Sequence, residues 1–131
     1  MIIASWKILG NDFDPRQFTE RFKLSAVVIA NRGDRDFRNR IVRIPGCNIS
    51  IPIRGNSMTS LVAGINRFIM RHKSAFIFLK RHGISSTIHV GVGVGSEKNF
   101  THSVVFNNKY LLVLAKLGVD LAVTGYPTSD N

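Results

Sequence analysis

Apolar residues in the middle of the chain follow a helical period. Between positions 57 and 82 they recur at steps of three and four, which places them on one face of a helix. The stripe consists of Leu61, Ile65, Phe68, His72, Phe76 and Leu79. Ser57 or Asn56 can cap this segment, and Gly83 can end it. The spacing predicts one helix of roughly 35–40 Å. Since this is longer than a helix needs to be to cover a small sheet, we expect a bend near Ser74.

The residues that follow alternate in the manner of a β-strand. Ile88, Val90, Val92 and Val94 alternate with His89, Gly91, Gly93 and Gly95. This pattern predicts a strand over 88–95 whose valine side faces the core. Glycine weakens a strand, so the bare opposite side must serve some purpose. That purpose is close approach of a neighbouring helix or chain, a ligand lying against the backbone, or irregularity at a sheet edge.

The flanking segments predict further strands and helices. Residues 2–9 are apolar on both sides, as in a central strand. Asp14 caps a helix over 13–24, Pro15 takes its first position, and Phe13 can pack onto Phe18. Asn107 caps a second short helix with an apolar stripe of Leu111, Leu114 and Leu117. Strands are predicted at 26–30, 41–44, 49–53, 103–106 and 119–124, with a mobile loop at 31–40 and a hairpin turn at 45–48.

These elements predict an α+β domain of two layers over residues 1–126, followed by a frayed tail at 127–131. We expect a mostly antiparallel sheet of about five strands with helices largely on one face, ferredoxin-like or a decorated relative. A chain of 131 residues fits one such domain. One layer of helices leaves the other sheet face uncovered, and a homodimer formed through that face would cover it.

Positive charge is concentrated in the middle of the chain. The net charge is +10, and residues 32–82 carry eleven Lys and Arg side chains against Asp34 and Asp36. Such a cluster favours an acidic partner, with a merely solvated surface as the alternative. The residues expected to contact the partner are Arg32, Arg35, Phe37, Arg38, Arg40, Arg43, Arg67 and Arg71.

An acidic protein surface is the preferred partner. No signature of a common nucleic-acid-binding module is present, and most of the nine phenylalanines fall on core stripes. The alternative is a nucleic-acid-binding domain that uses the basic loop 32–43 and the basic face of the helix over 57–82. Salt-sensitive contacts between arginines and phosphates would supply its affinity.

Catalytic chemistry finds little support in the sequence. The segment 91–98 (GVGVGSEK) has the composition of a phosphate loop, but its glycines lie inside a strand pattern and no helix follows. The histidines and Cys47 lack metal-ligand spacing, so no metal or cofactor is expected. Glu97 and His102, with His89 nearby, are the one acid–base combination, and no nucleophile accompanies them. We therefore expect a protein that is not an enzyme.

The number of cysteines and the length of the apolar runs predict the cellular compartment of the protein. A single cysteine excludes an intramolecular disulfide and fits the reducing cytoplasm. No apolar run reaches the length of a membrane span, and the first ten residues lack the features of a signal peptide. A cytoplasmic location is the expectation.

Three segments, taken in order, resemble a known family. They are residues 10–15 (GNDFDP), 32–34 (RGD) and 114–121 (LAKLGVDL). Together they resemble an uncharacterised bacterial family, domain of unknown function 4279, over nearly the whole chain. Residues 48–53 depart from it, since the family has a Trp-bearing strand there. The family has no established activity, and some members resemble immunity proteins of bacterial toxin systems. The resemblance implies a fold and, for function, an immunity-type protein interaction.

Overall fold

A five-stranded sheet and four helices make up the fold. The computed structural model describes residues 2–95 and 103–127. Its elements are β1 (Ile2–Leu9), α1 (Pro15–Arg21), β2 (Val28–Ala30), β3 (Gly46–Ser50), α2 (Met58–Arg71), α3 (Lys73–Arg81), β4 (Ser85–Val94), α4 (Asn108–Lys116) and β5 (Val119–Pro127). The strand order is β2-β3-β1-β4-β5, and only β4 and β5 pair in parallel. The predicted α+β class with a mostly antiparallel five-stranded sheet is confirmed.

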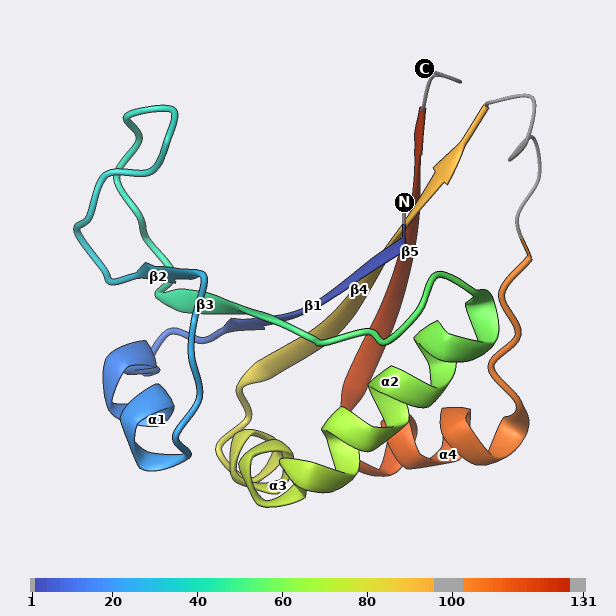
Figure 1. The fold of residues 1–131 in the computed structure, drawn as a ribbon. Helices are drawn as coiled ribbons and strands as arrows, with labels where there is room; N and C mark the ends of the chain where they lie inside the picture. The colour runs from blue at the N-terminus through green and yellow to red at the C-terminus, as the bar shows by residue number, and fades with distance from the viewer. Residues whose placement is uncertain (1, 96–102, 128–131) are drawn as a thin grey trace.

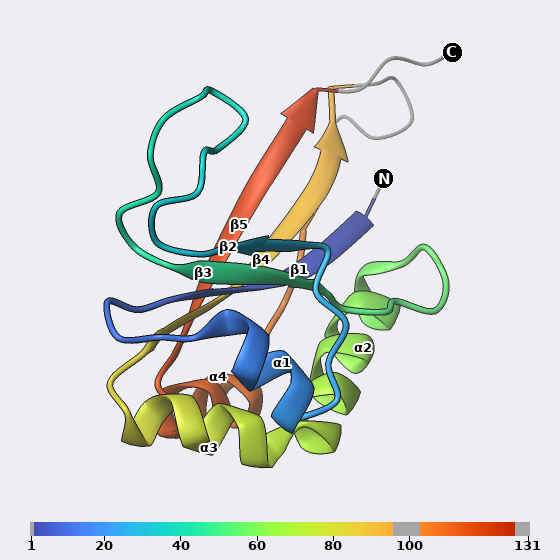
Figure 2. The same ribbon diagram turned by 90° about the vertical axis from the view of Figure 1, so that its left-hand side faces the viewer.

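All four helices lie on the same face of the sheet, and the described residues place no helix on the other face (Figure 1 and Figure 2). The core between the two layers is centred on Trp6 of β1, which is fully buried. The Phe76 ring stacks on Trp6 with 3.9 Å between ring centroids, and Trp6 Nε1 donates to Ser86 Oγ at 2.6 Å. No helix in the described part of the chain has the length and apolar character needed to cross a membrane.

The first four strands and their helices follow the order β-α-β-β-α-β, with α2 and α3 together in the second helical position. This order belongs to ferredoxin-like units. Here α4 and β5 extend the sheet beyond β4. The order by itself does not establish the ferredoxin-like assignment, which stays a prediction.

The predicted helix caps are present. Asp14 Oδ1 accepts from the Gln17 N–H at 3.1 Å, and the Phe13 and Phe18 rings lie 5.4 Å apart. Ser57 Oγ accepts from the Ser60 N–H at 3.1 Å, as predicted for a helix N-cap. The cap at Asn107 is likewise formed, by Oδ1 and the Tyr110 N–H at 3.2 Å. Each cap needs only residues close in sequence, which is why periodicity and residue type were sufficient.

The helix predicted over 57–82 is present, and its bend, predicted near Ser74, is a complete break at His72, so the prediction of one continuous helix is wrong. His72 ends α2 and begins α3 at φ −111° and ψ 26°, and the two helices run in different directions (Figure 1). The change of direction brings Phe68 of α2 and Phe76 of α3 onto the same tryptophan, Trp6. A straight rod would not follow the twisted sheet closely enough to supply both contacts.

The hairpin predicted over 41–53 is also wrong. Residues 45–48 form no turn, because β3 begins at Gly46 and pairs with β1 and β2. Gly46 is needed there, since a Cβ atom would clash with the Ile8 carbonyl oxygen. Residues 41–44 contain only an isolated bridge between Ile41 and Arg35. Residues 103–106 form no strand, and Leu111 of the predicted stripe is exposed.

Candidate functional site

The arginines predicted to bind a partner lie in two separate regions. The loop between β2 and β3, which carries those from Arg32 to Arg43, rises on the open side of the sheet (Figure 1 and Figure 2). Arg67 and Arg71 belong to α2, on the helical side. The tertiary structure therefore does not join these residues into one surface.

The cations on the helical side of the sheet border a hollow that we call the basic groove. It has a volume of about 670 Å³ and lies where the chain after α1 and the chain before α2 meet α2 itself. Its lining residues are Lys23, Leu24, Ser25, Ile49, Ser50, Pro52, Arg54, Gly64, Asn66, Arg67, Phe68, Met70, Arg71 and His72. Four of them are Lys or Arg and none is Asp or Glu, so the groove favours an anion.

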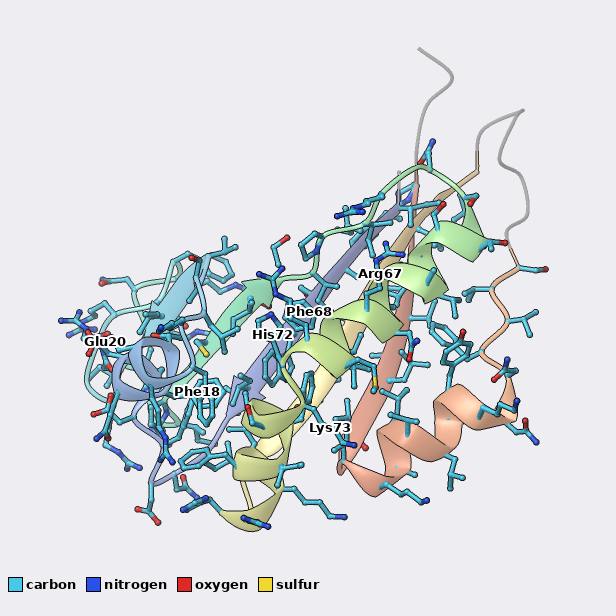
Figure 3. All side chains as sticks on the ribbon, turned by 60° about the horizontal axis from the view of Figure 1, so that its bottom comes forward. Phe18, Glu20, Arg67, Phe68, His72 and Lys73 are labelled. Carbon is cyan, nitrogen blue, oxygen red and sulfur yellow. The ribbon has the colours of Figure 1, made fainter. Side chains whose placement is uncertain are left out.

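The floor of the basic groove is apolar. Figure 3 shows Phe68 and His72 on the side of α2 that is turned toward α1, with Arg67 further along the helix. Phe68 is 8% exposed, and the His72 ring covers it at 4.6 Å between centroids. Met70 is 56% exposed, and its flexible side chain can adapt to apolar groups of a bound segment. Arginines above such a floor can pair with carboxylates in a bidentate manner.

Lys23, a wall of the basic groove, has a strained backbone. Its φ is +54°, and the Leu24 N–H donates to the Thr19 carbonyl at 2.8 Å across the end of α1. A helix end of this kind normally has glycine at the left-handed position. The chain instead keeps a lysine there, at a cost of about 1 kcal/mol. Lys23 thus adds a cation to the groove at a position where glycine would relieve the backbone strain.

Sequence reasoning missed Lys23 and Arg54 as groove residues. Lys23 could have been noticed, because the helix over 13–24 ends without glycine. Arg54 carried no local signal: it follows β3 and reaches the groove only through the packing of α2.

The imidazole of His72 is half-buried in this groove, and burial together with the Arg71 charge lowers its pKa. The folded chain thus binds a proton at His72 less readily than the unfolded chain does. This contribution to stability is complete above the ordinary histidine pKa of about 6.5 and is lost as pH falls through the folded pKa. We expect urea unfolding between pH 8 and pH 5 to show a smaller loss of stability in His72→Gln than in the wild type; equal losses would contradict this assignment.

The tip of the loop between β2 and β3 is held by hydrogen bonds to Asp36, and the predicted mobility of the loop stays a prediction. Asp36 Oδ1 accepts from the Arg38 and Arg40 N–H groups, both at 2.9 Å. The Arg40 hydrogen bond also lowers the pKa of Asp36. Phe37 stands at the tip with 91% exposure, and the Arg38 guanidinium lies 5.4 Å from its ring centroid. The tip thus presents a preformed aromatic and cationic pair.

The other arginines of the loop differ in their roles. Arg32 donates to the Asn11 carbonyl at 2.7 Å and ties the loop to the turn after β1. Arg35 donates to the Asn39 carbonyl at 2.9 Å within the loop. Arg43 is exposed. Arg32 and Arg35 therefore support the loop with donors that a partner would otherwise use.

The glycine side of β4 is closely approached at Gly91, as the first of the three expectations requires, but neither a helix nor another chain makes the approach. At Gly91 a Cβ would lie 2.8 Å from both Ile3 Cγ1 and Tyr126 Cε2, so side chains from β1 and β5 occupy that space. The close approach comes from neighbouring strands of the same sheet. Gly93 faces Tyr126 in the register, and Gly95 lies after the strand at φ +94°.

The acid–base combination has no geometry to support it. His89 is half-buried on the open face beside Ser5, whereas Glu97 and His102 lie outside the described residues. Within 2–95 and 103–127, no three His, Cys, Asp or Glu side chains are grouped so that they could hold a metal ion. Burial raises the pKa of the Cys47 thiol to about 11, which keeps it neutral near pH 7 and poor as a nucleophile.

Comparisons of the chain with protein-family models, with curated proteins and with solved structures found no match. The resemblance to domain of unknown function 4279 therefore stays a prediction.

Proposed function

We propose that this protein is a non-enzymatic binding module that holds an acidic segment of a partner protein in the basic groove. The observation that carries the proposal is the set of four Lys and Arg side chains around an apolar floor, with no carboxylate among the lining residues. Such a groove attracts acidic segments at long range and retains those that also carry apolar side chains. An immunity-type interaction, as the family resemblance implies, belongs to this class, and a cytoplasmic location accords with the single reduced cysteine.

A protein segment suits the groove better than a nucleic acid does. Single-stranded nucleic acids gain affinity by stacking bases on exposed aromatic rings. Phe68, the one phenylalanine among the groove residues, is 8% exposed and lies under the half-buried ring of His72. The exposed Met70 instead offers contact to aliphatic side chains.

Fluorescence anisotropy with defined probes tests the proposal. The probes are a labelled 15-residue peptide of Glu and Leu, a poly-Glu peptide of equal length and a 15-nucleotide single strand, each at about 50 mM salt. We expect the Glu/Leu peptide to bind most tightly. Arg67→Glu/Arg71→Glu should weaken that binding by about tenfold per reversed charge. The control variant is Arg16→Glu/Lys109→Glu, which lowers the net charge by the same amount. Both residues lie in the first turn of a helix, where a Glu side chain is favourable. This variant should bind the peptide as the wild type does.

Lys23→Gly separates binding from folding. Glycine accepts the left-handed backbone at the end of α1, so the variant should unfold at an equal or higher urea concentration than the wild type. The loss of one groove cation should weaken binding of the Glu/Leu peptide several-fold. A variant that binds as well as the wild type would show that the groove is not the peptide site.

The exposed loop tip favours nucleic acid as a second candidate, because Phe37 is exposed beside Arg38. A stacking ring next to a guanidinium is suited to a single strand. Binding of the 15-nucleotide strand at about 50 mM salt, lost in Phe37→Ala/Arg38→Ala, would favour this candidate. If the strand binds and the Glu/Leu peptide does not, the proposal of an acidic protein partner is wrong.

A further inference from the structure

The open sheet face carries a polar hollow of about 250 Å³, on the opposite side of the sheet from the basic groove. Lys7, Asn48, His89 and Thr124 are among its lining residues. We propose that this open-face hollow is a binding site for a small carboxylate that also carries a hydroxyl or amino group. The inference is independent of the partner-binding proposal, since the two sites share no residue.

Strand register brings these side chains together from β1, β3, β4 and β5. Lys7 of β1 lies opposite Asn48 of β3, and Ser5 of β1 lies opposite His89 of β4. Their neighbours Trp6 and Ile88 are buried beneath the helices, so alternate residues point to the open face. Sequence distance conceals this arrangement, because the four strands are far apart along the chain.

Gly91 gives the hollow its shape. Because Gly91 has no side chain, Ile3 Cγ1 and Tyr126 Cε2 come within 2.8 Å of the position that a Cβ would take, and these two side chains form walls of the hollow. Thr124 lies opposite Gly91 on β5. The hollow therefore has an apolar wall at Ile3, an amphipathic wall at Tyr126 and polar groups at its other end.

The polar end specifies the chemistry of the ligand. Lys7 supplies the ammonium group of the hollow, and no carboxylate lines it. Asn48 Oδ1 is buried and has no hydrogen-bond partner among the described residues. An unpaired buried acceptor is destabilising, and a ligand donor that reaches it would remove the penalty. A carboxylate paired with Lys7 and a hydroxyl or amino group beside Asn48 satisfy both side chains.

A second copy of the chain is a poorer occupant of this face. Interfaces exclude charge from their centres, whereas Lys7 stands on the central strand of the sheet. A dimer across this face would bury that ammonium without a carboxylate to pair with it. A small anionic ligand pairs with it directly.

Three probes with one carbon skeleton test the inference: L-malate, L-aspartate and succinate, which differ only in a hydroxyl, an amino group or a hydrogen. Each is titrated into ¹⁵N-labelled protein and followed by amide chemical shifts. We expect saturable shifts in β1, β3, β4 and β5, with malate or aspartate binding roughly tenfold more tightly than succinate. Lys7→Met should weaken binding about tenfold, whereas Lys109→Met, on the exposed surface of α4, should not.

Asn48→Leu provides a sharper control, because it removes the unpaired acceptor and leaves Lys7. The Asn48→Leu variant should bind malate, aspartate and succinate equally and weakly, without the preference of the wild type for malate or aspartate over succinate. The inference is overturned if none of the three probes has a dissociation constant below about 20 mM, because the binding free energy would then be less than roughly 2.5 kcal/mol. It is also overturned if the shifts appear at Arg67 and Arg71, or if sedimentation shows a dimer that protects the amides of the open face.

Discussion

Replacing Trp6 with alanine is expected to lower the free energy of unfolding by about 3–5 kcal/mol. The Trp6 side chain is fully buried, stacks on Phe76 at 3.9 Å, and meets the edges of Phe18 and Phe68 at 6.0 and 5.7 Å. It is thus the common contact of α1, α2 and α3. A single domain has only about 5–15 kcal/mol of stability, so the variant should lie near its unfolding limit.

Urea unfolding followed by far-UV circular dichroism measures this loss, since the variant has no other tryptophan for fluorescence. Ser86→Ala is the matched control. It removes the hydrogen bond from Trp6 Nε1 but keeps the rings in place, and should cost about 1–3 kcal/mol. A Trp6→Ala variant as stable as Ser86→Ala would contradict the placement of Trp6 at the centre of the core.

Replacing Gly46 with alanine is expected to destabilise the protein by about 3 kcal/mol. Gly46 begins β3 directly opposite Leu9, and an added Cβ would clash with the Ile8 carbonyl oxygen and lie 2.5 Å from Leu9 Cδ2. Backbone cannot move aside as a flexible side chain can. The register between β1 and β3 would have to shift, and β2, which pairs with β3, would be affected as well.

Gly83→Ala is the control for the Gly46 variant. Gly83 has φ +65°, yet no atom lies within 4 Å of the position that an added Cβ would take, so alanine there suffers backbone strain without a clash. Its expected cost is about 1–2 kcal/mol. Thermal and urea unfolding of both variants give the comparison, and a larger loss for Gly83→Ala would argue against the register described for β3.

Local chemistry explains the elements that were predicted well. Asp14 and Asn107 accept hydrogen bonds from backbone groups three residues away, and the alternation over 88–94 concerns a single strand. A backbone hydrogen bond or a side-chain period of this kind is complete within a short window of the chain. Residue type alone therefore indicates such elements.

The sequence predicted the candidate site only in part, because the residues of the site come from segments that are far apart along the chain. Charge counting identified Arg67 and Arg71, but it grouped them with a loop that the fold places on the other side of the sheet. It omitted Lys23, whose contribution depends on how α1 ends beside α2. Net charge in a sequence window carries no information about which face of a sheet each residue reaches.

The sequence by itself determined the α+β class, the helix caps and the strongly basic character of the protein, because each depends on residue type and short-range spacing. The tertiary structure decided the break at His72, the strand position of Gly46 and the two separate surfaces. These features arise where segments far apart in the chain must share one volume: α2 and α3 must both reach Trp6, and the backbone of β3 must fit against Ile8. Close packing between distant segments, which no local pattern encodes, selected these arrangements.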